Sequence, residues 1–597
     1  MQEQLLPGIA SPADLRALDR TELPRLAEEI RRTLIASVEK NGGHMASNLG
    51  VVELTIALHL SFCSPQDALV WDVSHQCYTH KLLTGRAAGF DGLRQSRGLS
   101  GFTNTAESEH DHFITGHSST SVSAALGIAE AKRLAGDEHY AVAILGDGAL
   151  TGGLVYEALN NAGRSAAKLI VVLNDNEMSI SRNVGGLSRY LAKVRSQPAY
   201  RKRKQRVERS LRRVPGAGDA LAGGVAGIKR LVKRVLTDTT IFEQLGLDYI
   251  GPVDGHDIGR LCAALESAKL SPRPTLVHVH TTKGKGYPRA EDAPEEYHGV
   301  SCSCDTGVSC TDLFAQALCA IAEEDPAVCA VTAAMAIGTG LGRFAVSYPG
   351  RFFDVGIAES HALVFASGLA RQGMRPVVAL YATFLQRGFD QLLHDIALQQ
   401  LTVTIAVDRA GFVGADGATH HGLYDVAMCG AVPGAAVYAP VTADELRGYL
   451  RAPRGLTLIR YARDCAKEID IPMTYQDVNY EIAGDVASDI AIVTYGRLFF
   501  EACKVPGVKV LRLKRVLPID DAAVEALLGC RRVCFFEEGI RSGGAAECFG
   551  AKLLERGFAG AYSIHAVEGF ARHAPVAELL AEHGLDAAAM QRAVEGR

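Results

Sequence analysis

The chain has little of what marks membrane, secreted or nucleic-acid-binding proteins. It has one tryptophan in 597 residues, and no run of about 18 uncharged apolar residues that would span a membrane. Its N-terminus lacks a basic stretch followed by an apolar core, so no signal peptide is expected. Neither charge dominates, since 62 Lys and Arg stand against 67 Asp and Glu, a net charge of -5. We therefore expect a cytoplasmic protein without a membrane or nucleic-acid partner.

The cysteines lack the pattern of a disulfide framework. The fourteen cysteines are scattered, and most lie in apolar runs such as 261–263 and 533–535, as expected of reduced, buried thiols in the cytosol. Cys302, Cys304 and Cys310 form the only cluster. Because paired CxxC units and a nearby His pair are missing, a cysteine-rich linker is favoured, with a zinc site as the alternative.

The composition and length indicate a globular protein of three domains. Hydrophobic residues make up 48% and charged residues 22% of the sequence. Short apolar runs alternate with helical segments, which predicts an α/β fold in which each domain is a mainly parallel sheet flanked by helices. We predict a first domain over residues 1–300, a linker over 301–312, a second domain over 313–475 and a third over 476–597. The third domain is expected to be structural and to assist dimerisation.

The apolar runs also locate individual strands. The clearest lie at 140–145, 169–173, 328–332, 376–380, 403–407, 490–496, 508–513 and 533–536, with a further strand that ends at 280. Between residues 193 and 213 the first domain carries a dense run of Arg and Lys. A solvated insertion on a surface helix or loop is favoured there over a patch that binds nucleic acid or phosphate.

Polar residues follow two of these strands in a specific arrangement. Gly146-Asp147-Gly148 ends one strand, and Asn176 stands 29 residues after Asp147 at the end of the next. The glycines let the backbone approach a phosphate, and the Asp and Asn oxygens suit Mg²⁺ that also binds substrate phosphates. Strand ends carry the ligand site in open α/β sheets. A Gly-Asp-Gly turn alone is common, but its pairing with Asn at this spacing predicts a magnesium and diphosphate site.

This spacing is that of the thiamine-diphosphate motif, and longer segments extend the likeness. They are NLG at 48–50, DVSHQCY at 72–78, GHSSTS at 116–121, GPVDGHD at 251–257, FDVGIAE at 353–359, TFLQR at 383–387 and DRAGFVGADG at 408–417. On these segments the chain resembles the 1-deoxy-D-xylulose-5-phosphate synthases, a transketolase-like family, over almost its whole length. The resemblance implies a transketolase-like thiamine-diphosphate-binding fold and a homodimer.

The resemblance also implies a reaction. It is the condensation of pyruvate with D-glyceraldehyde 3-phosphate, with release of carbon dioxide, to give 1-deoxy-D-xylulose 5-phosphate. That product is the first of the methylerythritol phosphate route to isoprenoids and also feeds thiamine and pyridoxal phosphate synthesis. Thiamine diphosphate and Mg²⁺ would be the cofactors, with Asp147, Asn176 and the Met178 carbonyl on the metal. Lys283 or Lys285 would reach the diphosphate, and the sequence leaves both open.

The resemblance assigns roles to further residues. The cofactor contacts would be His75, Gly116, His117, Ser118, Gly148, Ala149, Asn176, Tyr287, Glu359 and Phe384. Glu359 matches the glutamate that activates the cofactor, because a carboxyl group on the pyrimidine N1′ favours the tautomer that accepts the C2 proton. A carboxylate stabilised by a helix dipole is the alternative for Glu359, and an ordinary core aromatic is the alternative for Phe384.

Two more groups of side chains match family positions around the substrates. His44, His117, Asp416 and His420 would manage protons, although a lone His is often only a structural hydrogen-bonding residue. Tyr381, Arg409 and Arg460 would hold the aldehyde's phosphate, for which a guanidinium fork is suited. Arg94 and Arg387 would lie near the substrate carboxylate or phosphate, with surface ion pairs as the alternative.

The family pattern is broken at residues 103–106, 336–337, 360 and 462–464. These changes remove no cofactor ligand but put the aldehyde specificity and turnover in doubt. Two other functions stay open. One is another transketolase-like enzyme that moves a ketol unit, which a donor test with xylulose 5-phosphate would distinguish. The other is a weakly active paralogue that binds the cofactor as a regulatory or scaffold protein.

Overall fold

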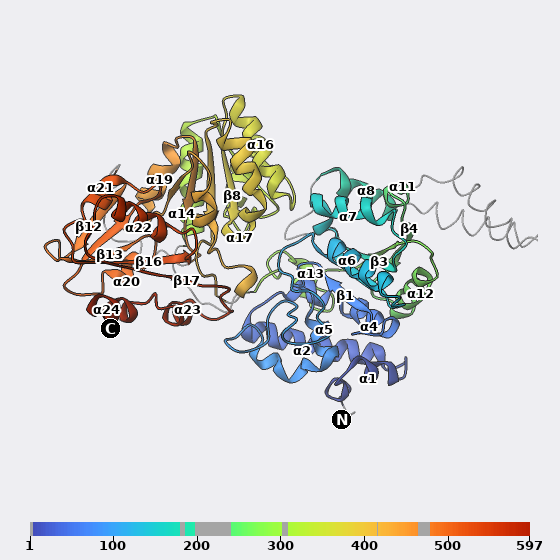
Figure 1. Ribbon diagram of the computed structural model, residues 1–597. Coiled ribbons are helices and arrows are strands. Elements are labelled where there is room, and N and C mark those ends of the chain that lie inside the picture. The colour runs from blue at the N-terminus through green and yellow to red at the C-terminus, as the bar shows by residue number, and fades with distance from the viewer. Residues whose placement is uncertain are drawn as a thin grey trace, which may run out of the picture. The chain divides into compact units, whose positions relative to one another are not determined.

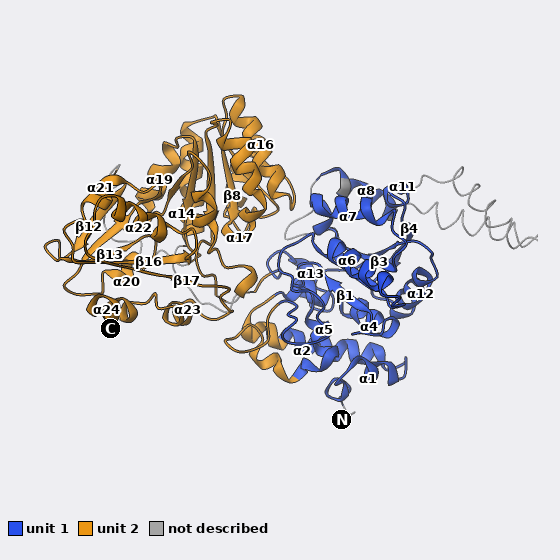
Figure 2. Ribbon diagram, in the orientation of Figure 1, with its two compact units in different colours: residues 1–35, 44–87, 102–298 blue, residues 36–43, 88–101, 299–597 orange. Residues whose placement is uncertain are grey.

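The computed structural model describes residues 4–178, 185–196, 240–300, 309–414, 416–463 and 478–596. Two compact units make up the chain (Figure 2). Unit 1 comprises Met1–Ile35, His44–Ala87 and Phe102–His298, and unit 2 comprises Ala36–Gly43, Ala88–Gly101 and Gly299–Arg597. From residue 197 onward, the predicted basic run lies outside the described residues, as do Cys302 and Cys304.

Unit 1 is built on a five-stranded sheet in the order β1-β2-β3-β5-β4, with every neighbouring pair parallel. Its strands are β1 (Ala68–Trp71), β2 (Ala141–Gly146), β3 (Leu169–Asp175), β4 (Asp248–Asp254) and β5 (Thr275–His280). The apolar run of β3 is buried along its whole length, as expected of a parallel strand covered on both faces. Its helices include α3 (Met45–Leu49), α4 (Val52–Ser61), α5 (Tyr78–Lys81), α6 (Ser121–Leu134), α7 (Gly153–Ala162), α12 (Ile258–Lys269) and α13 (Pro288–Asp292), most of which are labelled in Figure 1.

The larger sheet of unit 2 has the order β15-β10-β11-β9-β8-β6-β7, and only β15 is antiparallel to its neighbour. The strands are β6 (Val328–Thr332), β7 (Phe352–Asp354), β8 (Arg375–Tyr381), β9 (Val403–Asp408), β10 (Ala436–Tyr438), β11 (Leu456–Arg460) and β15 (Arg515–Leu517). Successive residues of β8 pack on opposite faces, with Val378 and Leu380 in the core beneath α16 (Glu359–Arg371), and Val377 and Ala379 in the core beneath α14 (Cys310–Glu324).

The second sheet of unit 2 has the order β12-β14-β13-β16-β17, and only the β12 and β14 pair is antiparallel. Its strands are β12 (Tyr480–Gly484), β13 (Ile490–Thr494), β14 (Lys509–Leu513), β16 (Arg532–Ile540) and β17 (Ala561–Val567). The other helices of unit 2 include α17 (Ala382–Leu385), α18 (Asp425–Gly430), α19 (Ala443–Arg451), α22 (Ala545–Glu555), α23 (Val576–Glu582) and α24 (Ala587–Glu595).

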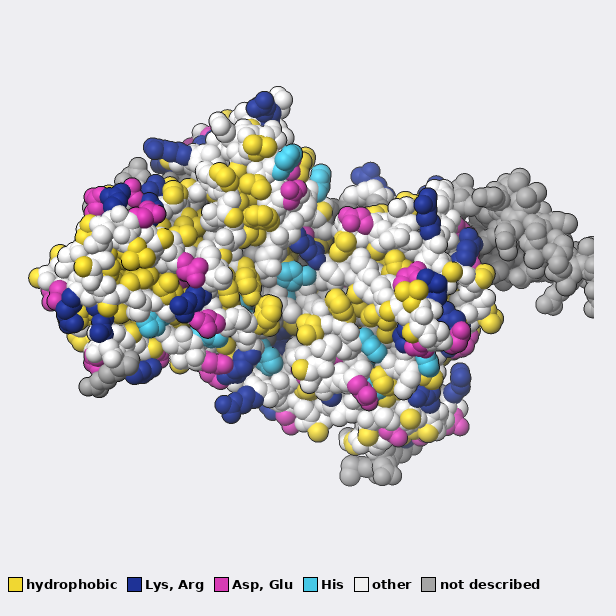
Figure 3. Space-filling model, viewed as in Figure 1, with side chains coloured by type: hydrophobic (Ala, Val, Ile, Leu, Met, Phe, Trp, Pro, Cys, Tyr) yellow, Lys and Arg dark blue, Asp and Glu magenta, His cyan; other side chains and the backbone are white. Residues whose placement is uncertain are grey.

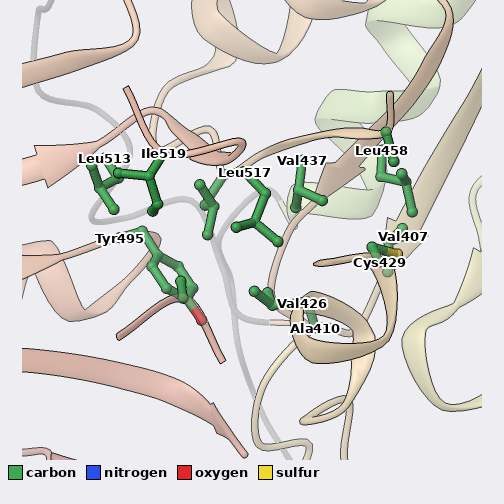
Figure 4. Close-up of a cluster of buried hydrophobic side chains, with 14 of the residues drawn as sticks. Val407, Ala410, Val426, Cys429, Val437, Leu458, Tyr495, Leu513, Leu517 and Ile519 are labelled. Carbon is green, nitrogen blue, oxygen red and sulfur yellow. The ribbon is translucent and has the colours of Figure 1, made fainter. Parts of the chain in front are cut away.

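One hydrophobic core joins the two sheets of unit 2. Figure 4 shows Val407, Val437 and Leu458 of the larger sheet in one cluster with Leu513 of the second sheet and with Tyr495, which follows β13. Strand β15 takes part directly, because it follows β14 in sequence but pairs with β10. This shared core explains why the predicted second and third domains form a single compact unit.

The fold class predicted from the sequence is confirmed, since all three sheets are mainly parallel and flanked by helices. Each predicted strand matches an observed one to within three residues at its ends, apart from β16, which extends to Ile540. The exact domain boundaries stay a prediction. The segments Ala36–Gly43 and Ala88–Gly101, which fall inside the predicted first domain, belong to unit 2.

The surface and the cysteines agree with the composition. On the face shown in Figure 3, side chains of both charge signs are interspersed. In the part of the chain that the structure describes, no helix is both long and apolar enough to cross a membrane. Cys77, Cys262 and Cys534 in the core are free thiols.

Candidate active site

Asp147 and Asn176 lie at the carboxyl ends of two neighbouring strands, β2 and β3. The Asp147 N–H donates to the Asn174 carbonyl at 3.1 Å, which fixes the two strand ends together. Asp147 Oδ1 accepts the Gly148 N–H at 3.0 Å, and Asn176 Oδ1 accepts the Met178 N–H at 3.1 Å. These two bonds orient a buried carboxylate and a half-buried amide at one edge of the sheet. The two strands are neighbours in the parallel sheet.

A buried lysine supplies positive charge at the same edge. Lys283 follows β5 and is 6% exposed, whereas Lys285 is half-buried. Burial lowers the pKa of Lys283 to about 8, and the attraction of Asp147 and then Glu295 offsets part of that effect. The electrostatic coupling to Asp147 favours Lys283 over Lys285 as the diphosphate contact, a choice that the sequence left open.

The loop that carries Lys283 is held by three residues that sequence reasoning did not single out. Arg31 donates from Nη2 to both oxygens of Glu53, at 2.6 and 2.7 Å, and from Nε to the Lys285 carbonyl at 3.0 Å. His256 accepts the Thr282 N–H at 2.9 Å, so its Nδ1 carries the proton that faces Glu53 at 3.1 Å. Burial would raise the pKa of Glu53, but the bonds from His256 and Arg31 outweigh it and lower that pKa.

The segment with Gly116, His117 and Ser118 is anchored by Asp72, which follows β1. The Asp72 carboxylate accepts the N–H groups of Ser119 at 2.8 Å and Ser121 at 3.0 Å. The Ser119 hydroxyl donates to the Ala149 carbonyl at 2.8 Å, which ties this segment to the turn after Asp147. Asp72 was part of a matching segment, but its anchoring role required the structure.

Three histidine rings form a cluster in unit 1. The ring centroids of His44, His75 and His298 lie 5.4 to 5.6 Å apart. The Asn48 amide donates to the His44 carbonyl at 2.6 Å and to the His75 carbonyl at 2.7 Å, which holds these two residues in place. Burial lowers the pKa of His298 well below its usual value, and the charges of Lys283, His75 and His44 add to this effect.

His298 is a candidate that sequence reasoning missed, because it stands just before the linker in a segment without periodicity. Tyr287, which was predicted to contact the cofactor, immediately precedes α13 and is half-buried. Its ring lies edge-on to Tyr297, with centroids 5.7 Å apart.

In unit 2, Glu359 is the first residue of α16 and is 5% exposed. Burial raises the pKa of this carboxyl group above its usual value, and Arg387 offsets only part of the rise. Arg387 Nη1 lies 3.5 Å from Glu359 Oε2. Ser360, which replaces the usual family residue, donates its hydroxyl to the Arg387 carbonyl at 2.8 Å and so helps to hold Arg387 there. Arg387 is thus a neighbour of Glu359.

Aromatic side chains lie at the end of β8 and in α17, which follows it. Phe384 in α17 is stacked with Tyr381, with centroids 5.6 Å apart, and lies edge-on to His420 at 5.6 Å. The His420 Nδ1 lies 2.8 Å from the Thr419 hydroxyl. The guanidinium of Arg409 lies over the Tyr381 ring, 4.1 Å from its centroid. Burial raises the pKa of Tyr381 to about 12, so its hydroxyl keeps its proton.

Three arginines surround Asp416. Arg94 Nη2 donates to Asp416 Oδ1 at 2.7 Å, while Arg463 and Arg409 approach Oδ2 at 3.5 and 3.8 Å. Burial would raise the pKa of Asp416, but Arg94, His420 and the other two arginines outweigh it and hold that pKa well below its usual value. Three cations around one carboxylate leave an excess of positive charge, which suits a phosphate dianion. We call Arg94, Arg409, Arg463 and Asp416 the arginine cluster.

The expectation for Arg460 needs correction. Its guanidinium is 5% exposed, donates from Nε to Asp425 Oδ2 at 2.8 Å, and lies 5.0 Å from the centre of the Tyr495 ring. A buried guanidinium with its own carboxylate is a structural ion pair and is not available to bind a substrate phosphate. Arg463, three residues later, joins the arginine cluster instead.

The donors in unit 1 fit thiamine diphosphate and Mg²⁺. A carboxylate and an amide oxygen from adjacent strand ends are hard oxygen ligands of the kind that Mg²⁺ prefers together with phosphate oxygens. A Cβ placed on Gly146 would meet no atom within 4 Å, so there is open space beside the Asp147 turn. The buried Lys283 supplies the charge that a diphosphate requires.

Comparison with known proteins agrees with this geometry. The family model described as 1-deoxy-D-xylulose-5-phosphate synthase matches residues 6–281, and that of the transketolase pyrimidine binding domain matches residues 306–458. The 1-deoxy-D-xylulose-5-phosphate synthase of Symbiobacterium thermophilum is 45% identical, with 98% of this chain and 92% of that protein covered. The one from Thiobacillus denitrificans is also 45% identical and covers 100% of this chain and 99% of itself. The chain therefore belongs to the 1-deoxy-D-xylulose-5-phosphate synthase family.

Proposed function

We propose that this protein condenses pyruvate with D-glyceraldehyde 3-phosphate, with loss of carbon dioxide, to form 1-deoxy-D-xylulose 5-phosphate, the first step of isoprenoid precursor synthesis. One observation carries the proposal. The buried Glu359 and two arginines of the cluster, Arg409 and Arg463, follow strands of one sheet, in a chain that full-length relatives of this family match at about 45% identity. Thiamine diphosphate, when bound, supplies the carbon centre that takes up pyruvate and releases carbon dioxide.

The residues of unit 1 would bind the cofactor's charged end. Asp147, Asn176 and the Met178 carbonyl would hold Mg²⁺, and Lys283 would neutralise the diphosphate. Gly148 and Ala149 would line the phosphate turn, while Gly116, His117 and Ser118 lie just before Ser119 and Ser121, whose N–H groups Asp72 accepts. This role requires a rigid arrangement, which the interstrand bond from Asp147 to Asn174 supports.

In unit 2, Glu359 would share a proton with the pyrimidine ring nitrogen. A carboxyl group with a raised pKa holds a proton more readily, so proton sharing with a weakly basic nitrogen is favourable. Phe384, stacked with Tyr381, would provide the apolar face for the ring. Arg387 would keep enough positive charge nearby for Glu359 to ionise when the ring takes the proton.

The histidines and the arginine cluster would serve the two substrates. His44, His117, His298 and His420 would hold or move protons at the substrate oxygens, and the lowered pKa of His298 keeps it a neutral acceptor. Arg409, Arg463 and Arg94 would bind the aldehyde's phosphate, with Tyr381 as a hydroxyl donor. Asp416 would hold the three guanidinium groups in register before the substrate arrives.

The proposed enzyme is a cytoplasmic homodimer. The family resemblance implies the homodimer, and light scattering of the purified protein tests it.

The test is a donor and product assay. The purified protein is incubated with Mg²⁺, thiamine diphosphate, pyruvate and D-glyceraldehyde 3-phosphate, and the product is identified by mass. We expect 1-deoxy-D-xylulose 5-phosphate and one carbon dioxide per product. Cleavage of xylulose 5-phosphate without use of pyruvate would instead show a transketolase. Cofactor binding without turnover on any aldehyde would show a paralogue that only binds the cofactor.

A further inference from the structure

The arginine cluster is assembled from separate chain segments. Arg94 lies in the segment Ala88–Gly101, and Asp416 lies in the loop that follows β9. Both Arg94 and Arg409 have positive φ angles, 62° and 59°, which non-glycine residues adopt only when surrounding contacts hold them. Their guanidinium groups are therefore only as well placed as the structure that fixes these two segments.

A short C-terminal segment, residues 572–578, contacts both the Ala88–Gly101 segment and the loop that carries Asp416. On the Arg94 side, His573 Nε2 donates to the Gln95 carbonyl at 2.9 Å. Next to it, Arg572 donates to the Ser96 hydroxyl at 2.7 Å, and that hydroxyl donates to Glu578 at 2.8 Å. The two residues that follow Arg94 are thus both bound by this segment.

The same segment holds the Asp416 loop. His421 accepts the Val413 N–H on Nδ1 at 3.1 Å and donates from Nε2 to the Arg572 carbonyl at 3.0 Å. Gly417, with φ +70°, lies so close that a Cβ on it would stand 2.8 Å from the His573 Cβ. His573 therefore touches the residue beside Arg94 with its ring and the residue beside Asp416 with its Cβ.

We infer that His573 is a positioning residue that sets the separation of Arg94 from Asp416 and so shapes the arginine cluster for a phosphorylated aldehyde. The C-terminal part of the chain then contributes to substrate selection and is more than a structural support. This inference rests on the proposed function, because it concerns the phosphate subsite of that reaction. His573 acts through geometry, since it binds Gln95 and packs on Gly417.

The experiment compares D-glyceraldehyde 3-phosphate with unphosphorylated D-glyceraldehyde as acceptors in the holoenzyme. For His573→Ala we expect the ratio of the two kcat/KM values to fall about ten-fold, mainly through KM for the phosphorylated aldehyde, because small displacements of binding groups are costly. KM for pyruvate should not change. His573→Gln, whose amide can donate to the Gln95 carbonyl, should restore most of the ratio. Arg541→Ala, which removes an exposed ion pair with Glu568 in the same part of the chain, should leave it unchanged.

A second pair of variants tests the same contact from the other side. Gly417→Ala should lower the ratio because its Cβ would push against His573. Gly434→Ala is the matched control, since Gly434 has a similar φ of +77° but no atom near its Cβ position. The inference is wrong if folded His573→Ala and Gly417→Ala keep the parent ratio, or if they lose activity equally on both aldehydes. A parent protein that forms no 1-deoxy sugar phosphate would instead refute the proposed function.

Discussion

Glu359 combines burial with a nearby cation, Arg387. Its side chain is almost inaccessible at the start of α16, and Arg387 approaches it at 3.5 Å. A helix N-terminus favours a carboxylate, so burial and the helix act in opposite directions on its charge. The pKa of Glu359 is raised, so burial has the larger effect.

Replacement of Glu359 by Gln tests its catalytic role. We expect pyruvate decarboxylation to fall by at least about 100-fold, because the amide cannot exchange a proton with the cofactor. The melting temperature should change little, since Gln has the same shape and no charge to desolvate. Steady-state carbon dioxide release measures the rate. Glu324→Gln, at an exposed ion pair with Arg451, is the matched control, and parent activity in the Glu359 variant would contradict the assignment.

Arg463 and Arg460 should behave differently although they are three residues apart. Arg463→Ala removes a cation from the arginine cluster, so KM for D-glyceraldehyde 3-phosphate should rise about ten-fold with an unchanged melting temperature. Arg460→Ala leaves the buried Asp425 without its partner, so stability should fall by about 3–5 kcal/mol. Kinetics and thermal melting of both variants separate the two roles. A stable Arg460 variant with a raised KM would restore the original expectation for that residue.

These residues also show what the sequence could predict. Asp147, Asn176 and Glu359 were found because each stands in a local motif at a strand end or helix start. Arg463, His298 and Asp72 were not assigned these roles, because their importance comes from contacts between segments that are distant in sequence. Arg460 was misassigned because residue type and position along the chain do not reveal that Asp425 neutralises it.

At the scale of elements, helices α4 and α5 are joined by a buried polar chain. His59 Nε2 lies 2.9 Å from His80 Nδ1, and His80 Nε2 lies 3.0 Å from Asp111 Oδ1, which Arg86 also binds. Because the carboxylate accepts from His80 Nε2, His80 Nδ1 accepts the proton of His59 Nε2. Burial lowers the pKa of His59 well below its usual value, and neighbouring positive charge adds to this effect.

This chain predicts how stability depends on pH. In the unfolded protein His59 titrates near 6.5, whereas in the folded protein its pKa is lower, so the unfolded state binds more protons at acid pH. Stability should therefore be lost as pH falls below about 6.5, by up to about 1.4 kcal/mol per pH unit for this group. His59→Gln, which can still donate to His80, should weaken the dependence of melting temperature on pH between 7.5 and 5.5. His139→Gln, at an exposed site, is the control, and an unchanged slope in the His59 variant would refute the prediction.

At the scale of the molecule, local sequence located the strands with the clearest apolar runs, left others such as β1, β10 and β11 unassigned, and did not show how strands are shared between the sheets. Each apolar run is a local signal, so β6 and β9 were located almost to the residue. The return of β15 to the larger sheet and the joining of Ala88–Gly101 to unit 2 depend on tertiary packing, which no local pattern encodes. The predicted second and third domains consequently share one core.

That shared core predicts that the two sheets of unit 2 lose stability together. Leu517 is 6% exposed, lies in β15 and pairs with Val437 of β10 while it packs in the joint core. Leu517→Ala should cost about 2–5 kcal/mol. Hydrogen exchange followed by mass spectrometry should then show faster exchange in both β9 and β13, because each packs against the same cluster, while β2 and β3 keep the parent rates. Leu276→Ala, in the core of unit 1, should produce the opposite pattern. If β9 keeps its protection in Leu517→Ala while β13 loses it, the two sheets are independent and the single core does not act as one cooperative body.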